Sequence, residues 1–166
     1  DISKWDVSNV VNMEGTFYGV TSFNQNIGIW DVSSVTDMKY MFSYADDFNQ
    51  SLSDWNVSSV TNMQAMFSSY YESVFNQNLS KWDVSSVTNM GGMFYGSSSF
   101  NKDISSWNTS NVINMSGMFS GATAFNGQLY SWDTRNVQDM TEMFMDATSF
   151  NGEIYGRRMS ETYDEE

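Results

Sequence analysis

The sequence predicts one α/β repeat solenoid, in which about six units of roughly 25 residues each contribute a short strand and a short helical or 3₁₀ turn. One observation behind this prediction is the even spacing of the Trp residues along the chain. Another is the change of apolar periodicity within each unit, from alternation to helical spacing. A unit this small cannot bury its apolar face alone, so neighbouring units must stack. We assign residues 1–156 to this single solenoid.

Columns of large apolar residues define the repeat. The Trp recur 25 residues apart, except that 27 residues separate Trp55 from Trp82, where "SSYYESVF" carries an insertion. The twelve Phe form two further columns, and Met forms two more, with only Met145 and Met159 outside them. Stacked strands lie ~4.8 Å apart, so each column is expected to become a buried ladder. The Trp column comprises Trp5, Trp30, Trp55, Trp82, Trp107 and Trp132.

Each element of the unit has its own signal. In "LSDWNVSSV", apolar and polar residues alternate around Trp55, which predicts the strand. In "MKYMFSYADDF", apolar residues fall at i, i+3, i+4 and i+7 counted from Met38, which predicts the helical turn. The residues expected to cap that helical turn are Asn12, Asp37, Asn62, Asn89, Asn114 and Asp139. A further column is expected to bond to neighbouring backbone, and it comprises Asn24, Asn49, Asn76, Asn101, Asn126 and Asn151.

Composition excludes several classes of function. The chain has no His and no Cys, which removes the usual zinc ligands, thiol nucleophiles and His general bases. No nucleophile motif is present, so we predict no catalytic residues, no cofactor and no enzyme activity. The net charge of −13 argues against nucleic acid as a partner. No apolar run approaches the ~20 residues of a membrane span.

One candidate binding surface is a strip of polar residues, one in each predicted strand, between the inward-facing Trp and Val. These residues are Asp6, Asp31, Asn56, Asp83, Asn108 and Asp133. On an exposed sheet face they would suit sugar hydroxyls, a protein partner or Ca²⁺, or they would simply keep the face solvated. One carboxylate per unit falls short of the about six to eight oxygens that Ca²⁺ takes, so we assign no metal site.

The second candidate surface is the insertion that interrupts the repeat. It carries Tyr70 and Tyr71, and loops that break a repeat commonly lie on the binding side. Exposed Tyr side chains are good anchors for proteins and sugars. Covering the edges of neighbouring units is the alternative role for these two side chains.

The recurring motif "WDVSSVTNMKYMF…DFNQSLSDW" resembles the BspA-type branch of the leucine-rich-repeat superfamily, whose repeat is about 25 or 26 residues. Two features depart from ordinary leucine-rich repeats. Only three Leu are present (Leu52, Leu79 and Leu129), and Val occupies the position of the usual ladder Asn. The resemblance implies a cell-surface or secreted module for adhesion or recognition, and it implies no catalytic residues.

We therefore expect a non-catalytic interaction or adhesion module with a protein or carbohydrate partner. An architectural subunit that associates end to end within a larger assembly is the first alternative. The second alternative is a module that binds an ice or mineral lattice, Ca²⁺ or carbohydrate. The stack is expected to be part of a longer array, because the chain opens at "DISKW", the end of a repeat unit. The pattern is lost at Arg157, which stands where the next Trp is due. Residues 157–166 are expected to form a charged, disordered tail.

Overall fold

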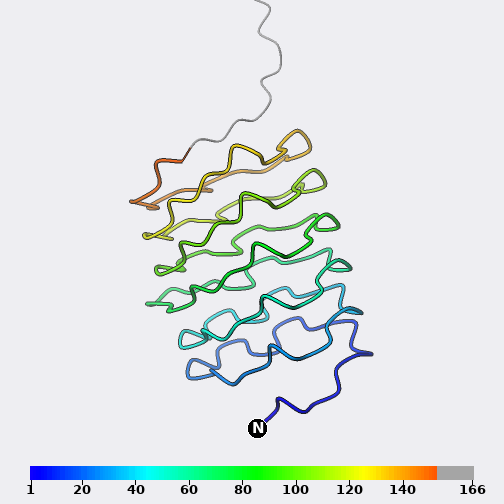
Figure 1. The fold of residues 1–166 in the computed structure, drawn as a ribbon. Helices are drawn as coiled ribbons and strands as arrows, with labels where there is room; N and C mark the ends of the chain where they lie inside the picture. The colour runs from blue at the N-terminus through cyan, green and yellow to red at the C-terminus, as the bar shows by residue number, and fades with distance from the viewer. Residues whose placement is uncertain (153–166) are drawn as a thin grey trace, which may run out of the picture.

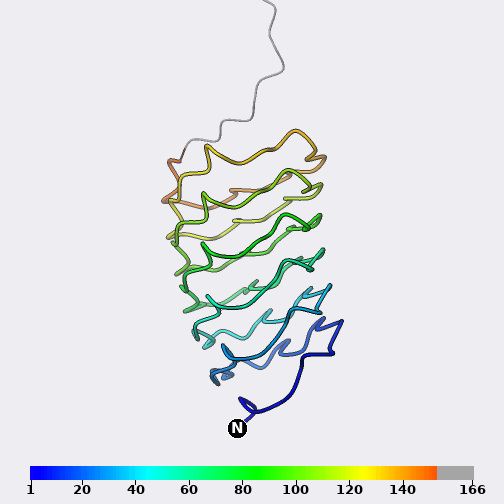
Figure 2. The ribbon, with the colours of Figure 1, turned by 45° about the vertical axis from the view of Figure 1, so that its right-hand side comes forward.

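The chain winds into coils that stack one on another along a single axis, with the N-terminus at one end (Figures 1 and 2). This computed structural model describes residues 1–152. Among these residues there is no helix, and the only strand-like pairings are isolated parallel bridges between neighbouring coils. The bridges join Asn12 to Asp37, Asp37 to Asn62, Asn62 to Asn89, Asn89 to Asn114 and Asn114 to Asp139.

The predicted α/β architecture, with a leucine-rich-repeat-like strand and helical turn in each unit, is therefore wrong. Each coil is instead a chain of tight turns, closed by a backbone N–H that donates to the carbonyl three residues earlier. Bonds of this kind run from Trp30 to Ile27 (3.0 Å) and from Phe48 to Ala45 (2.9 Å). Both end residues of these turns are buried. Consecutive turns place apolar residues three or four positions apart, which is also the spacing of apolar residues on one face of a helix.

Left-handed backbone conformations explain why the Met-rich segment is not helical. The φ angle is positive at two positions, four residues apart, in most coils, and a right-handed helix cannot include such residues. Gly15 and Gly19 occupy these positions in the first coil, whereas Tyr40 (φ 56°) and Tyr44 (φ 59°) occupy them in the second. The expected capping residues do bond to backbone: Asn62 Oδ1 accepts the N–H of Gln64 at 3.1 Å. They open a turn, however, and not a helix.

Main-chain hydrogen bonds between coils are concentrated on one side of the stack. Tyr40 N–H donates to Gln64 O and Phe42 N–H to Met66 O, both at 2.9 Å, and the intervening N–H groups close turns within the coil. The same alternation recurs in the other coils. We call this surface the ladder face; its segments are 11–19, 36–44, 61–69, 88–96, 113–121 and 138–146.

Away from the ladder face, side chains supply most of the links between coils, and main-chain bonds such as that from Asp47 N–H to Thr21 O at 2.9 Å are few. Asn49 Oδ1 accepts the N–H of Asn76 at 3.0 Å, and Asn76 Oδ1 accepts the N–H of Asn101 at 3.0 Å. This confirms the expectation that the Asn after each second Phe bonds to neighbouring backbone. The Trp indoles act in the same way, since Trp82 Nε1–H donates to Leu52 O at 2.9 Å.

Replacing Asn76 by Ala is expected to lower the free energy of unfolding by about 1–2 kcal/mol, because the N–H of Asn101 loses its acceptor. Denaturant titration measures the change. Gln138→Ala is the control, since the Gln138 side chain is exposed and its backbone N–H, which donates to Ile113 O at 2.8 Å, is kept in the variant. Equal stability of the two variants would contradict a structural role for the Asn column.

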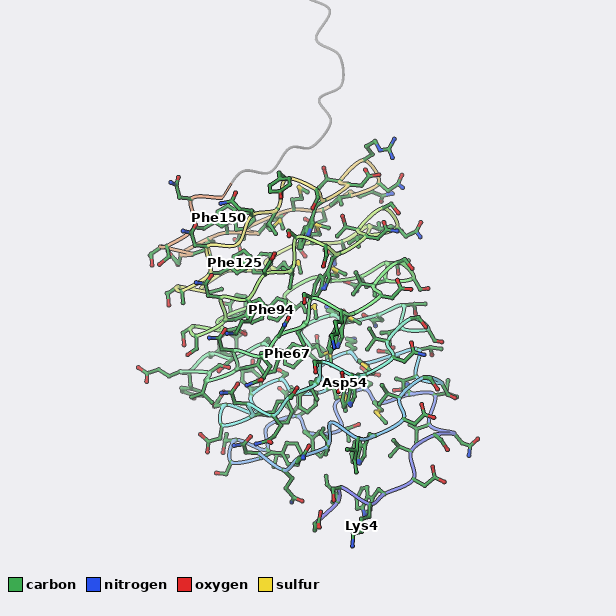
Figure 3. The ribbon with its side chains drawn as sticks, viewed as in Figure 1. Lys4, Asp54, Phe67, Phe94, Phe125 and Phe150 are labelled. Atoms are coloured by element: carbon green, nitrogen blue, oxygen red, sulfur yellow. The ribbon has the colours of Figure 1, made fainter. Side chains whose placement is uncertain are left out.

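Stacked aromatic columns form the core (Figure 3). The ring centroids of Phe67 and Phe94 lie 5.7 Å apart and those of Phe125 and Phe150 lie 5.9 Å apart, with planes nearly parallel. Trp82 and Trp107 stack at 6.5 Å. The predicted burial of the columns is confirmed for the coils in the middle of the stack, whereas Trp5 in the first coil is 61% exposed and Met140 in the last described coil is 40% exposed. The end of the predicted solenoid (153–156) and the predicted tail (157–166) lie outside the described residues.

Candidate binding groove

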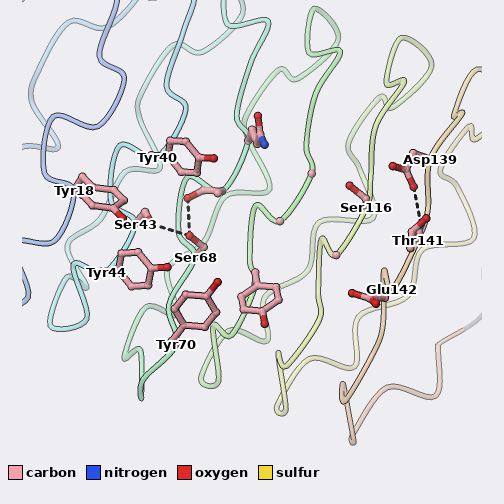
Figure 4. Close-up of a pocket in the computed structure, with 16 residues that line it drawn as sticks. Tyr18, Tyr40, Ser43, Tyr44, Ser68, Tyr70, Ser116, Asp139, Thr141 and Glu142 are labelled. Carbon is pink, nitrogen blue, oxygen red and sulfur yellow. Dashed lines mark hydrogen bonds between the residues drawn. The ribbon is translucent and has the colours of Figure 1, made fainter.

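A groove with a volume of about 840 Å³ crosses the ladder face (Figure 4). Its floor follows the first left-handed position of the coil. Ala65, Gly92 and Gly117 hold this position in three successive coils and leave space above the backbone. Tyr40 and Glu142 hold the same position in the coils on either side. The groove therefore exists because the first left-handed position carries small residues in the middle coils and large residues in the coils on either side.

Tyr residues form the wall at one end of the groove, and we call this set the tyrosine wall. Its members are Tyr18, Tyr40, Tyr44, Tyr70 and Tyr95. Tyr18 meets Tyr44 edge to face with ring centroids 5.4 Å apart, and Tyr70 meets Tyr95 in the same way at 5.4 Å. Tyr44 and Tyr70 stack at 5.4 Å. Mutual packing holds these rings in place before any ligand arrives, which lowers the entropic cost of binding.

The Tyr44 phenol stays protonated over a wide pH range. Burial, followed by its hydrogen bond with Tyr70, raises the pKa of Tyr44 to about 12. A neutral phenol can donate a hydrogen bond to a ligand as well as accept one. Beside it, the hydroxyls of Ser43 and Ser68 share a hydrogen bond of 2.8 Å at the buried edge of the groove.

Carboxylates occupy the opposite end. Asp139 Oδ1 accepts the N–H of Thr141 at 2.9 Å, and the hydrogen bonds from Thr141 hold the pKa of Asp139 below its usual value. Glu142 lies in the same coil, and both side chains are exposed. Asp139 and Glu142 are therefore available as acceptors for cationic or hydroxyl groups of a ligand.

Of the residues predicted to bind a partner, only Tyr70 lines this groove. Tyr70 is 70% exposed and contributes to the tyrosine wall. Tyr71 does not line it: it is 73% exposed and borders a smaller hollow of about 260 Å³, which Tyr70 and Glu72 also line. The insertion thus places Tyr70 between the groove and the smaller hollow, and Tyr71 at the smaller hollow.

None of the six residues of the predicted polar strip lines the groove. The expectation that they lie on an exposed sheet face is wrong, because the backbone at these positions forms no strand. Asp31 Oδ1 accepts the N–H of Ser33 at 3.1 Å, and Asn56 Oδ1 accepts the N–H of Ser58 at 3.2 Å. Hydrogen bonds from Ser33 lower the pKa of Asp31. Equivalent turn-closing bonds are made by Asp6, Asp83, Asn108 and Asp133.

Metal ligands are not gathered anywhere in residues 1–152: no group of three or more acidic side chains is placed to hold an ion. The four carboxylates of the strip, Asp6, Asp31, Asp83 and Asp133, lie in four different coils.

Sequence reasoning missed most of the groove. Tyr18, Tyr40, Tyr44 and Tyr95 all fall off the buried columns, which was the available signal. The sequence did not reveal where these Tyr side chains lie relative to the first left-handed position of each coil, which Gly15, Tyr40 and Ala65 occupy. Once that column is known to face outward, its small residues predict a depression.

Comparison with known proteins places the chain in a repeat-containing family. The model of a family described as "Mycoplasma protein of unknown function, DUF285" matches residues 1–72 and again residues 69–165, nearly the whole chain. The chain belongs to the DUF285 family. The two DUF285 matches meet at the "SYYE" insertion, next to the tyrosine wall. No curated protein and no solved structure matches this DUF285 chain. No helix within residues 1–152 has the length and hydropathy needed to cross a membrane.

Proposed function

We propose that this chain is a non-catalytic recognition module, and that it binds its partner in the groove on the ladder face. The observation that carries the proposal is the tyrosine wall beside a floor of small residues. The volume of about 840 Å³ falls within the range of about 300–1,000 Å³ typical of ligand sites. Pre-packed Tyr side chains, here exposed or half-buried, provide large contact areas at a low entropic cost.

The chemistry of the lining favours binding over catalysis. Phenols, hydroxyls and an amide dominate it, and a lowered pKa makes the Asp139 carboxyl a poor general acid. The resemblance of the motif to BspA-type proteins supports placement of the module at a cell surface or outside the cell. Adhesion through a protein or carbohydrate partner is the corresponding role.

The test is a binding survey on arrays of purified extracellular proteins and of glycans. Wild type is compared with Tyr44→Ala/Tyr70→Ala and with Asp31→Asn/Asp83→Asn, each first shown to be folded by circular dichroism. We expect the double Tyr variant to lose at least about tenfold in affinity for any bound array member, as for aromatic anchors elsewhere. The strip variant should bind like wild type, because the same column already holds Asn56 and Asn108. The opposite pattern would move the site to the strip.

An architectural role is the second candidate, favoured by the apolar surface of the first coil. Trp5 is 61% exposed there, whereas the equivalent Trp30 in the next coil is 5% exposed. A further repeat or another copy stacked on this coil would bury the Trp5 side chain. Sedimentation velocity over a range of concentrations tests self-association, and Trp5→Ser should abolish it if this surface is responsible.

A further inference from the structure

The charged residues that line the groove have one sign. None of its sixteen lining residues is Lys or Arg, whereas Asp139 and Glu142 supply two carboxylates at the end away from the tyrosine wall. The chain as a whole carries a net charge of −13. An anionic ligand would meet repulsion both at long range and on contact, and a cationic one would be attracted.

The tyrosine wall already holds a cation from the chain itself. Lys39 Nζ lies 4.9 Å from the ring centroid of Tyr40, and the same nitrogen lies 3.6 Å from Glu14 Oε1. An ammonium group is thus held between an aromatic face and a carboxylate at the edge of the groove. The groove offers a ligand the same two kinds of group, aromatic rings at one end and carboxylates at the other.

The length of the groove suits an extended chain. Tyr40 and Glu142 hold equivalent positions four coils apart, a separation of ~19 Å at the ~4.8 Å spacing of paired chains. An extended peptide advances ~3.3 Å per residue, so about six residues span this distance. The Gly92 and Gly117 positions between them present main chain without a side chain, which allows the backbone of a peptide to approach closely.

Ring packing favours a peptide over a sugar. Sugars bind best on a flat, freely exposed aromatic face, but the rings of the tyrosine wall meet mostly edge to face, with interplanar angles of 79°, 88° and 81°. The faces are therefore largely shared with neighbouring rings. Phenol hydroxyls suit the carbonyl groups of a peptide as hydrogen-bond acceptors.

We propose that the groove binds an extended basic peptide segment of about six residues. An Arg or Lys side chain of this segment reaches Asp139 and Glu142, and an apolar side chain packs on the tyrosine wall. The inference rests on the proposed function and specifies the chemical class of its partner. Guanidinium groups form bidentate hydrogen bonds with carboxylates, so Arg is the better cation at this end.

The experiment measures fluorescence polarisation with labelled hexapeptides on the whole chain. The probes are Leu-Leu-Ser-Gly-Arg-Arg, its reversed sequence, and versions of both with Glu in place of Arg. We expect at least one Arg peptide to bind and both Glu peptides to fail. Binding should weaken as salt rises, because the attraction is partly between exposed charges.

Three variants locate the site. Asp139→Asn/Glu142→Gln should weaken Arg-peptide binding by about tenfold or more, which corresponds to the loss of one charge-assisted contact. Asn114 holds the equivalent position in the preceding coil, and its Oδ1 accepts the N–H of Ser116 as Asp139 Oδ1 accepts that of Thr141. Asp139→Asn should therefore preserve the fold. Ala65→Tyr should block the groove, and the backbone accepts Tyr there because Tyr40 holds the same position with a similar φ. Asp103→Asn, which removes a carboxylate outside the groove, should bind like wild type.

Equal binding of Arg and Glu peptides would overturn the inference, and so would undiminished binding by Ala65→Tyr. Suppose that no Arg peptide binds, but that a glycan from the array binds to wild type and not to Ala65→Tyr. This result would also overturn the inference, while leaving the proposed function intact. Binding to array members that neither Ala65→Tyr nor the double Tyr variant affects would contradict the proposed function itself.

Discussion

Replacing Trp82 by Ala is expected to reduce the free energy of unfolding by about 3–5 kcal/mol, a large part of the stability of a domain of this size. Trp82 is 3% exposed and stacks on Trp107 with ring centroids 6.5 Å apart. Its indole N–H also donates to Leu52 O, which would lose this donor. The variant therefore combines a large cavity with the loss of one of the two hydrogen bonds that Leu52 O accepts; the other comes from Trp55 N–H. Urea titration followed by circular dichroism measures the loss.

Trp5→Ala is the matched control for Trp82→Ala. Trp5 belongs to the same column and stacks on Trp30 at 6.4 Å, but it is 61% exposed. Its replacement should cost about 1 kcal/mol, in line with partial burial. Similar losses in the two variants would show that burial within the stack does not determine the contribution of the Trp column.

Gly96→Ala is expected to destabilise the chain by about 3–5 kcal/mol through two additive effects, left-handed strain and steric overlap. The φ angle of Gly96 is +63°, where side chains are disfavoured. A Cβ atom at Gly96 would also overlap the backbone carbonyl oxygen of Ser69. Backbone atoms held by the ladder cannot move aside as a flexible side chain can. Thermal and urea denaturation give the loss.

Gly19→Ala separates the two effects. Gly19 occupies the equivalent position in the first coil with φ +71°, but no atom lies within 4 Å of the added Cβ. The variant should lose only the about 1–2 kcal/mol of left-handed strain. If Gly96→Ala were no less stable than Gly19→Ala, the close approach of Ser69 to Gly96 would be disproved.

The columns of the core were predictable from the sequence, but the backbone that carries them was not. Every unit has a Trp at the position of Trp82 and a Phe at the position of Phe94. This recurrence required that equivalent side chains stack, whatever the local structure. Periodicity within the unit was misleading because successive tight turns, such as Met38–Met41 and Phe42–Ala45, reproduce the spacing of a helix. Gly at two positions four residues apart was the signal against a helix. Tyr40 and Tyr44 hid it, because they adopt the left-handed conformation without being Gly.

The candidate site could likewise be predicted only in part from the sequence. Tyr70 was predicted because the insertion is visible in the sequence. The rest of the groove depends on which columns face outward on the ladder face, and that depends on the turns. The polar strip was proposed as a binding surface on the assumption of a strand at Asp31 and Asn56. Their side chains instead satisfy backbone N–H groups locally, a role that short polar residues serve in turns.

The hydrogen bonds between coils have a mechanical consequence. Both the backbone bonds of the ladder face and the Asn column join one coil to the next, so they lie along the axis of the stack. Tension applied along that axis loads the bonds of one junction together, but different junctions separate independently. Each coil that detaches would release about 25 residues, or ~85 Å of extended chain. A tether built in this way would lengthen stepwise under force and dissipate energy at each step.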